Sequence, residues 1–213
     1  MRKLLLITRP QYEPTTHYLF YWNKKVIDFA RKKKVDIIDL HRKRANKKEF
    51  TSVVVKRQPN LILFNGHGSS DSINGQDDKV LVKTGENEDL LKDKIIYALS
   101  CETAKVLGPK SVSMGTISYL GYDEVFIFYY SKDKVNRPLE DKVAELFLEP
   151  SNQVAISLLK GHTTREANQR SKASFLKNIQ QLSTTESSET YLVRFLVWDM
   201  VHQVCLGDQN AQI

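Results

Sequence analysis

The sequence predicts a single α/β domain in which helices cover both faces of a mostly parallel sheet. Short apolar runs at residues 4–7, 35–40 and 61–64 are typical of buried strands, and the stretches between them carry apolar residues at helical spacing. Strands that alternate with helices in this way are joined by crossovers, so they pair in parallel and are buried on both faces. Because 41% of the 213 residues are hydrophobic, the chain can bury one substantial core and is not intrinsically disordered.

The helices between the first three strands are marked at their ends. One occupies residues 15–34, where Thr15 or Thr16 can serve as the N-cap. The next occupies residues 46–58 and is ended by Pro59. We find no internal repeat and no linker long enough to divide the chain, so we expect one domain over residues 1–213.

The rest of the chain continues the pattern after one polar excursion. Residues 69–79 contain Asn74-Gly75, a dipeptide that favours a tight turn, and we expect a small β-hairpin there. The run at 125–129 is apolar enough to be a central strand, and the Ser/Thr/Glu-rich residues 183–189 form a loop. We expect further strands at Ile95–Leu99 and 125–129, and helices at 86–94, 139–148, 151–160, 164–182 and 189–205.

Positive charge is concentrated in the first part of the chain. Lys and Arg number 32 against 25 Asp and Glu, a net +7, yet residues 1–60 alone carry 16 basic and 5 acidic side chains, a net +11. A basic adaptor that binds nucleic acid through residues 31–48 is therefore one candidate function. No aromatic residues interleave the basic runs to stack on bases, and cations at helix ends stabilise the helices themselves. We do not expect nucleic acid to be the partner.

Several other classes of protein are excluded or disfavoured by composition. No apolar run is long enough to span a membrane, the apolar N-terminal stretch is too short for a signal peptide, and Cys101 and Cys205 make no disulfide framework, so we expect a cytoplasmic protein. No phosphate-binding glycine loop is present. His202 and Cys205 form at most half of a zinc site, and an acidic stretch between residues 77 and 89 is expected to be a solvated loop rather than a calcium site. We expect neither metal nor cofactor.

Reactive side chains follow two of the expected strands. His67 comes shortly after the strand at 61–64, and Cys101 shortly after the strand Ile95–Leu99. The carboxyl ends of neighbouring parallel strands meet at one edge of the sheet, where sites in α/β folds form. A thiol attacks only as the thiolate and needs an adjacent base, which histidine supplies near neutral pH. We therefore expect a His67/Cys101 dyad.

The residues around the dyad fit acyl transfer. Gly66 and Gly68 allow tight backbone geometry and close approach of a substrate peptide. The backbone amides of Gly68 and Cys101 could stabilise an oxyanion. A helix is expected to begin at Glu102, and its positive end would lower the pKa of the thiol.

The two strings Asn65-Gly-His-Gly68 and Ala98-Leu-Ser-Cys-Glu-Thr-Ala104 resemble the caspase-hemoglobinase fold, and within it the CHAT-type peptidases. The later strings Gly115-Thr-Ile-Ser-Tyr-Leu-Gly121, Leu158–Ala167 and Leu206-Gly-Asp208 resemble the same family. The resemblance implies a three-layer sandwich with a mostly parallel central sheet. It also implies a cysteine endopeptidase that cleaves protein substrates, with His67 as general base, Cys101 as nucleophile and a thioester intermediate. Such peptidases act in regulated defence or cell-death responses, which suggests an activating protein partner.

The resemblance leaves the residue before the scissile bond unassigned. Arginine-specific members carry an acid two positions before the nucleophile or just after the following strand; here Leu99 occupies the first position and Ser131 lies near the second. Asp133 could replace that acid if the loop is longer, and Ser69, which follows Gly68, is a further candidate for substrate binding. A catalytically silent caspase-like interaction module is the remaining alternative, and retention of both dyad residues weighs against it.

Overall fold

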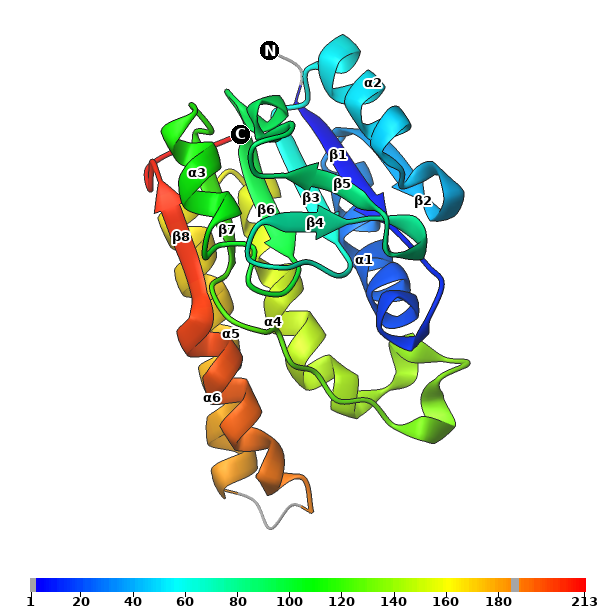
Figure 1. The fold of residues 1–213 in the computed structure, drawn as a ribbon. Coiled ribbons are helices and arrows are strands. Elements are labelled where there is room, and N and C mark those ends of the chain that lie inside the picture. The colour runs from blue at the N-terminus through cyan, green and yellow to red at the C-terminus, as the bar shows by residue number, and fades with distance from the viewer. Residues whose placement is uncertain (1–2, 185–187) are drawn as a thin grey trace.

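A twisted sheet of six strands forms the centre of the computed structural model, which describes residues 3–184 and 188–213 (Figure 1). The strand order is β2-β1-β3-β6-β7-β8, and every pairing is parallel except that of β7 with β8. The strands are β1 (Leu4–Arg9), β2 (Asp36–His41), β3 (Leu61–Asn65), β6 (Ile95–Leu99), β7 (Ser118–Tyr122) and β8 (Gln203–Gly207). The predicted α/β class with a mostly parallel sheet is confirmed.

Helices and a hairpin form the outer layers. One face of the sheet is covered by α1 (Pro14–Lys32), α4 (Lys142–Leu159) and α5 (Thr164–Thr184). The other is covered by α2 (Lys47–Arg57), α3 (Leu107–Ser113) and the hairpin of β4 (Ser72–Asn74) with β5 (Val80–Lys83). Helix α6 (Val193–His202) packs against α5, and the two project past the sheet (Figure 1). Short 3-10 turns complete the chain: η1 (Arg42–Arg44), η2 (Gln76–Asp78), η3 (Glu88–Leu91), η4 (Lys132–Lys134), η5 (Pro138–Glu140) and η6 (Thr190–Leu192).

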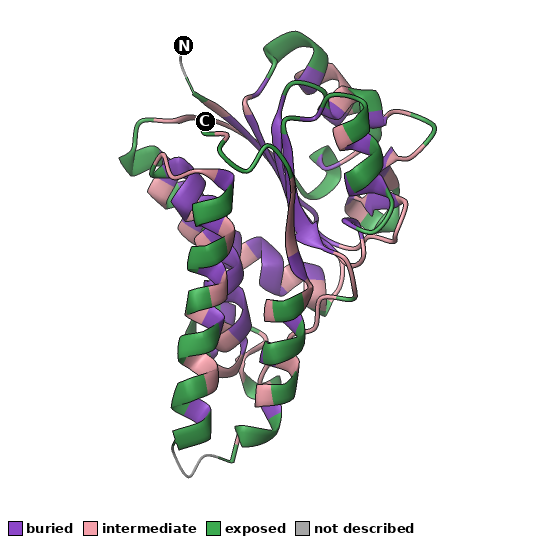
Figure 2. Cartoon of the chain, turned by 90° about the vertical axis from the view of Figure 1, so that its left-hand side faces the viewer, coloured by how far each residue is buried: buried purple, intermediate pink, exposed green. Residues whose placement is uncertain are grey.

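The core consists of two apolar layers separated by the sheet. Alternate residues of each strand face opposite sides, so Leu5 and Ile7 of β1 pack toward α1 and α4, whereas Leu6 packs toward α2 and the hairpin. All residues of β3 and β6 are buried, as expected for strands covered on both faces. Figure 2 shows the middle of the sheet as buried. This rigid pair of central strands supports the loops that carry His67 and Cys101.

The strand predicted at 125–129 is wrong. The strand after β6 is β7, formed by the less apolar Ser118–Tyr122, and residues 125–130 run without a backbone ladder. Their apolar side chains are nevertheless used, because Phe126 and Phe128 pack against two clusters of the core. The amide of Ile127 donates to the carboxylate of Asp199 at 3.0 Å instead of to a neighbouring strand.

The two helices predicted at 139–148 and 151–160 form one helix, α4, which continues through Pro150. A proline inside a helix leaves the carbonyl four residues earlier without its usual donor. Here that carbonyl belongs to Leu146, and it accepts a hydrogen bond of 2.8 Å from the side chain of Asn178 on α5. The neighbouring helix therefore replaces the missing donor, so the proline does not end the helix.

Other boundaries also differ from the predictions. The helix predicted over 189–205 ends at His202, and the chain continues as β8; the segment predicted as a helix at 86–94 contains only the turn η3. The predicted hairpin is present, but its connection is wider than a tight Asn-Gly turn, because it passes through η2. Of the loop predicted at 183–189, residues 185–187 lie outside the described residues.

Candidate active site

The loops that carry His67 and Cys101 leave the sheet side by side. Strands β3 and β6 pair in parallel with Asn65 opposite Leu99, and His67 and Cys101 each follow two residues after the end of their strand. The contact continues one residue past the strands, since the amide of Gly66 donates to the carbonyl of Leu99 at 3.3 Å. The predicted meeting of the two loops at one sheet edge follows directly from this register.

Gly68 packs closely against the Cys101 loop. A Cβ built at this glycine would lie 2.6 Å from Cγ2 of Thr103 and 3.1 Å from Cβ of Ser100. It would also lie 3.0 Å from the carbonyl oxygen of Ser72, because Gly68 forms a β-bridge with Ile73 of the hairpin. Only a residue without a side chain allows this approach. The amides of Gly68 and Cys101, predicted to form an oxyanion hole, therefore belong to two loops in direct contact.

A carboxylate accompanies His67 on its other side. The side chain of His67 is 38% exposed, and its Nε2 atom lies 3.4 Å from Oε1 of Glu13. Its ring also faces that of Tyr12, with centroids 6.2 Å apart. The imidazole thus has a nearby acid that can orient it.

Glu13 is fixed by its position at the start of α1. It is the N-cap residue, and its carboxylate accepts hydrogen bonds from the amides of Thr15, at 2.8 Å, and Thr16. Burial alone would raise the pKa of Glu13, but these two amides and nearby His67 outweigh it, so the pKa is lowered. The prediction that Thr15 or Thr16 caps this helix was wrong. The sequence contained a signal for this cap. Proline favours the first position of a helix, and Glu13 directly precedes Pro14.

Cys101 has a more enclosed environment. Its sulfur lies 3.8 Å from the carbonyl oxygen of Phe126, and the residue is half-buried. Burial raises the pKa of the thiol, and the nearby carboxyls of Asp199 and Glu102 raise it further. The helix predicted to begin at Glu102 begins only at Leu107. The predicted lowering of the thiol pKa by a helix N-terminus is therefore wrong.

Asp199 is an acid beside this thiol that the sequence did not single out. It lies on the apolar helix α6 and is fully buried. Its Oδ1 accepts the amide of Ile127, whereas Oδ2 has no hydrogen-bond partner among the described residues. Burial raises the pKa of Asp199 well above its ordinary range, and the amide of Ile127 offsets only part of this effect.

The four candidates for substrate binding lie in different surroundings. Leu99 is buried in the core and contacts the His67 loop through its carbonyl. The hydroxyl of Ser69 donates to Asp71 at 2.7 Å within its own turn. The amide of Ser131 donates to Asp141 at 2.7 Å, and Asp133 lies exposed in η4. The polar groups of Ser69 and Ser131 are thus engaged by neighbouring acids.

His202 and Cys205, considered from the sequence as half of a zinc site, each contact a different neighbour. Nδ1 of His202 lies 2.8 Å from Oδ1 of Asp123, and the sulfur of Cys205, on β8, lies 3.7 Å from Oγ of Ser118. Within residues 3–184 and 188–213, no three His, Cys, Asp or Glu side chains are grouped so that they could hold a metal ion. In the same ranges, no helix combines the length and apolar character needed to cross a membrane.

Comparison with known proteins identifies the fold. No model of a known protein family matches the sequence, and no curated protein matches it. A crystal structure described as the Arg specific cysteine proteinase gingipain R (RgpB) superimposes with a TM-score of 0.67 at 9% identity, covering 99% of this chain and 47% of that one. A complex of the Porphyromonas gingivalis RgpB pro- and mature domains gives a TM-score of 0.64 at 9% identity, with 99% and 48% covered. This chain spans about half the length of these two neighbours. The chain therefore has a caspase-like α/β fold, as its sequence predicted.

Proposed function

We propose that this protein is a cysteine endopeptidase in which Cys101 is the nucleophile and His67 the general base. The observation that carries this proposal is the close contact of the two loops, fixed by the register of β3 with β6 and by the approach of Gly68 to Ser100 and Thr103. The resemblance of the strings around His67 and Cys101 to CHAT-type peptidases supports it. The similarity in fold to a cysteine proteinase supports it as well.

The proposed reaction uses the two nitrogens of His67 for different tasks. Nε2 faces Glu13, so Nδ1 remains to take the proton from the Cys101 thiol. The thiolate adds to the scissile carbonyl, and the amides of Gly68 and Cys101 donate to the oxyanion. When the C–N bond breaks, His67 returns the proton to the leaving amine and a thioester remains on Cys101. Water then hydrolyses the thioester, releasing the acid and the free thiol.

The surroundings of the thiol support a regulated enzyme. With its pKa raised by burial and its sulfur directed at the Phe126 carbonyl, Cys101 is a weak nucleophile near neutral pH. A shift of residues 125–131 would free the sulfur to approach His67. Such a shift is one that an activating protein partner could cause, in keeping with a role in regulated defence or cell-death responses.

The test is labelling by a panel of peptide electrophiles with different residues before the reactive group. We expect the wild type, alone or with a cell extract added as a source of activator, to be labelled at Cys101, and Cys101→Ala and His67→Ala each to reduce labelling at least about a thousandfold. Cys205→Ala and His202→Ala are the matched controls, since both residues are half-buried and lie outside the two loops. Undiminished labelling of Cys101 in the His67→Ala protein would contradict the dyad.

The burial of Cys101 favours a second candidate, a caspase-like interaction module without peptidase activity. In that case the wild type would not be labelled at Cys101, either alone or after a cell extract is added as a source of activator. Labelling of the wild type that depends on His67 would eliminate this candidate.

A further inference from the structure

A basic hollow lies at the end of the sheet edge that carries the candidate dyad. It has a volume of about 380 Å³ and lies where β2 ends, close to the hairpin connection. Its lining residues are Gln11, His41, Arg42, Lys43, Arg44 and Gln76. Part of the excess positive charge of the first 60 residues is therefore gathered around one concave surface.

The charges of this hollow differ in how far they are neutralised. Arg44 pairs with Glu49 at 3.2 Å. Arg42 and Lys43 have no carboxylate partner within residues 3–184 and 188–213. The guanidinium of Arg42 is instead positioned by the side-chain oxygen of Gln11, which accepts from Nε at 2.8 Å.

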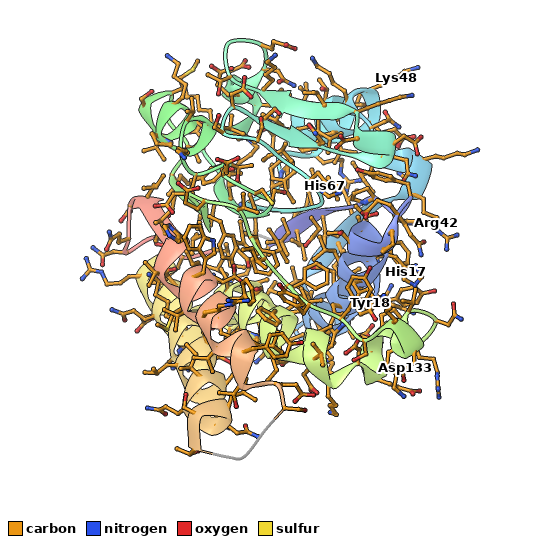
Figure 3. All side chains as sticks on the ribbon, turned by 60° about the horizontal axis from the view of Figure 1, so that its bottom comes forward. His17, Tyr18, Arg42, Lys48, His67 and Asp133 are labelled. Atoms are coloured by element: carbon orange, nitrogen blue, oxygen red, sulfur yellow. The ribbon has the colours of Figure 1, made fainter. Side chains whose placement is uncertain are left out.

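The hollow is connected to His67 by the segment that follows β1. Gln11 lines this hollow and also a second one of about 270 Å³, to which Tyr12 and Glu13 contribute. Tyr12 and Glu13 are the two residues that face His67. In Figure 3, Arg42 and His17 lie on the same side of His67. Residues 11–13 therefore link the surroundings of His67 to the rim of the basic hollow.

Strand spacing gives the length of this path. The order β6-β3-β1-β2 places the Cys101 loop, the His67 loop, residues 11–13 and η1 in sequence along the edge. Neighbouring strands lie about 4.8 Å apart, so three spacings separate the end of β6 from that of β2 by about 14 Å. An extended peptide advances about 3.3 Å per residue, so about four residues cover this distance.

The chemistry of the dyad fixes the direction of the peptide. The base returns its proton to the leaving amine, so the leaving group lies on the His67 side of Cys101. Continuing from His67 toward β2 therefore follows the substrate in the direction of its C-terminus. We propose that the basic hollow binds acidic side chains located about four residues after the scissile bond, an assignment that rests on the proposed peptidase function.

An acidic peptide fits the hollow better than nucleic acid does. Arg42 presents a fork of donors that suits a single carboxylate, and Lys43 adds a second positive charge. Carboxylates flank the hollow as well, since Glu49 pairs with Arg44 and Asp77 accepts from the side chain of Gln76 at 3.0 Å. These acids would repel a continuous phosphate backbone but leave room for one or two carboxylates. Among the residues that the structure describes, no Phe, Tyr or Trp lines the hollow to stack on bases.

The first experiment measures binding and does not require catalysis. A fluorescent peptide with two adjacent Glu residues and its Gln counterpart are titrated with the Cys101→Ser protein at low salt. We expect the Glu peptide to bind about tenfold more tightly, a preference that Arg42→Gln with Lys43→Gln abolishes and that salt weakens. Lys32→Gln with Lys56→Gln is the matched control, because these exposed lysines lie elsewhere on α1 and α2. Equal binding of both peptides would overturn the proposal, as would tighter binding of a single-stranded oligonucleotide of equal charge.

The second experiment measures cleavage by the active protein. Two quenched peptide libraries, randomised before the scissile bond, carry Glu or Gln at the fourth and fifth positions after it. We expect kcat/KM to be about tenfold higher for the Glu library, through KM, and the ratio to approach one in the Arg42→Gln/Lys43→Gln protein. Cleavage without this preference would contradict the proposed binding role of the hollow and would leave the proposed peptidase function standing. Binding of the Glu peptide without any cleavage would support the proposed binding role of the hollow and would count against the proposed peptidase function.

Discussion

The two halves of the candidate site differ in how ready they are for chemistry. On the β3 side, His67 is open to solvent and has a carboxylate partner at 3.4 Å. On the β6 side, the Cys101 thiol is half-buried and directed at the backbone carbonyl of Phe126, and its burial raises its pKa. In the proposed reaction the base is therefore positioned in advance, whereas the nucleophile is protected. Control of the proposed activity is expected to act on the cysteine side.

The largest effect is expected where the two halves touch. In Gly68→Ala the new Cβ would lie 2.6 Å from Cγ2 of Thr103, so the loops must separate. We expect the free energy of unfolding to fall by about 2–3 kcal/mol and electrophile labelling to be nearly lost. Chemical denaturation and labelling rates measure both effects.

Gly85→Ala is the control for this substitution. Gly85 has a positive φ, of 80°, which Gly68 does not share, and no atom of the described residues lies within 4 Å of a Cβ built there, so only the backbone conformation is strained. We expect it to cost about 1 kcal/mol and to leave labelling unchanged. If Gly68→Ala behaved in the same way, the close contact of the two loops would not be needed for the site.

The next effect separates the two tasks of Glu13, which caps α1 and accompanies His67. Glu13→Ala removes both, and we expect a loss of about 1 kcal/mol of stability at pH 7. Glu13→Gln retains a cap acceptor without the charge, so we expect it to lose less stability. Labelling should slow about tenfold in both variants, because the charge beside His67 is gone. Full labelling of the Glu13→Gln protein would show that the carboxylate of Glu13 is not needed at the site.

The stability effect of Glu13 has a defined pH dependence. The pKa of this carboxyl is lowered in the folded protein, so its contribution to stability is present above the ordinary Glu pKa. That contribution is lost as the pH falls through the folded value. The difference in unfolding free energy between the wild type and Glu13→Ala should therefore shrink in acid. Denaturation curves at pH 7 and pH 3 test this.

The smallest effect is expected at Asp199, on the cysteine side. Its pKa is raised by burial, so the wild type loses stability as the pH rises from the ordinary Asp pKa through the folded value. Asp199→Asn keeps an acceptor for the amide of Ile127 and cannot ionise. We expect it to be more stable than the wild type by about 1 kcal/mol at pH 8 and equal at pH 3. A variant less stable at pH 8 would contradict the burial of an ionisable group here.

The sequence predicted the strands around the site better than the contacts that complete it. Ile95–Leu99 matched β6 at both ends, because a short apolar run buried on both faces has clear limits. The run at 125–129 failed because an apolar pattern reports burial and not backbone pairing. Glu13 was missed because its contact with His67 joins residues far apart in the chain, and Asp199 because it lies within an apolar helix.

Residues 125–131 are held over Cys101 by side chains. The indole of Trp198 donates to the carbonyl of Val125 at 2.9 Å, and the carboxyls of Asp199 and Asp141 accept the amides of Ile127, at 3.0 Å, and Ser131, at 2.7 Å. Backbone pairing between strands persists when most residue types change. Each of these three hydrogen bonds, by contrast, depends on one particular side chain. A single substitution at Trp198, Asp199 or Asp141 can therefore loosen residues 125–131 over Cys101 and leave the sheet untouched.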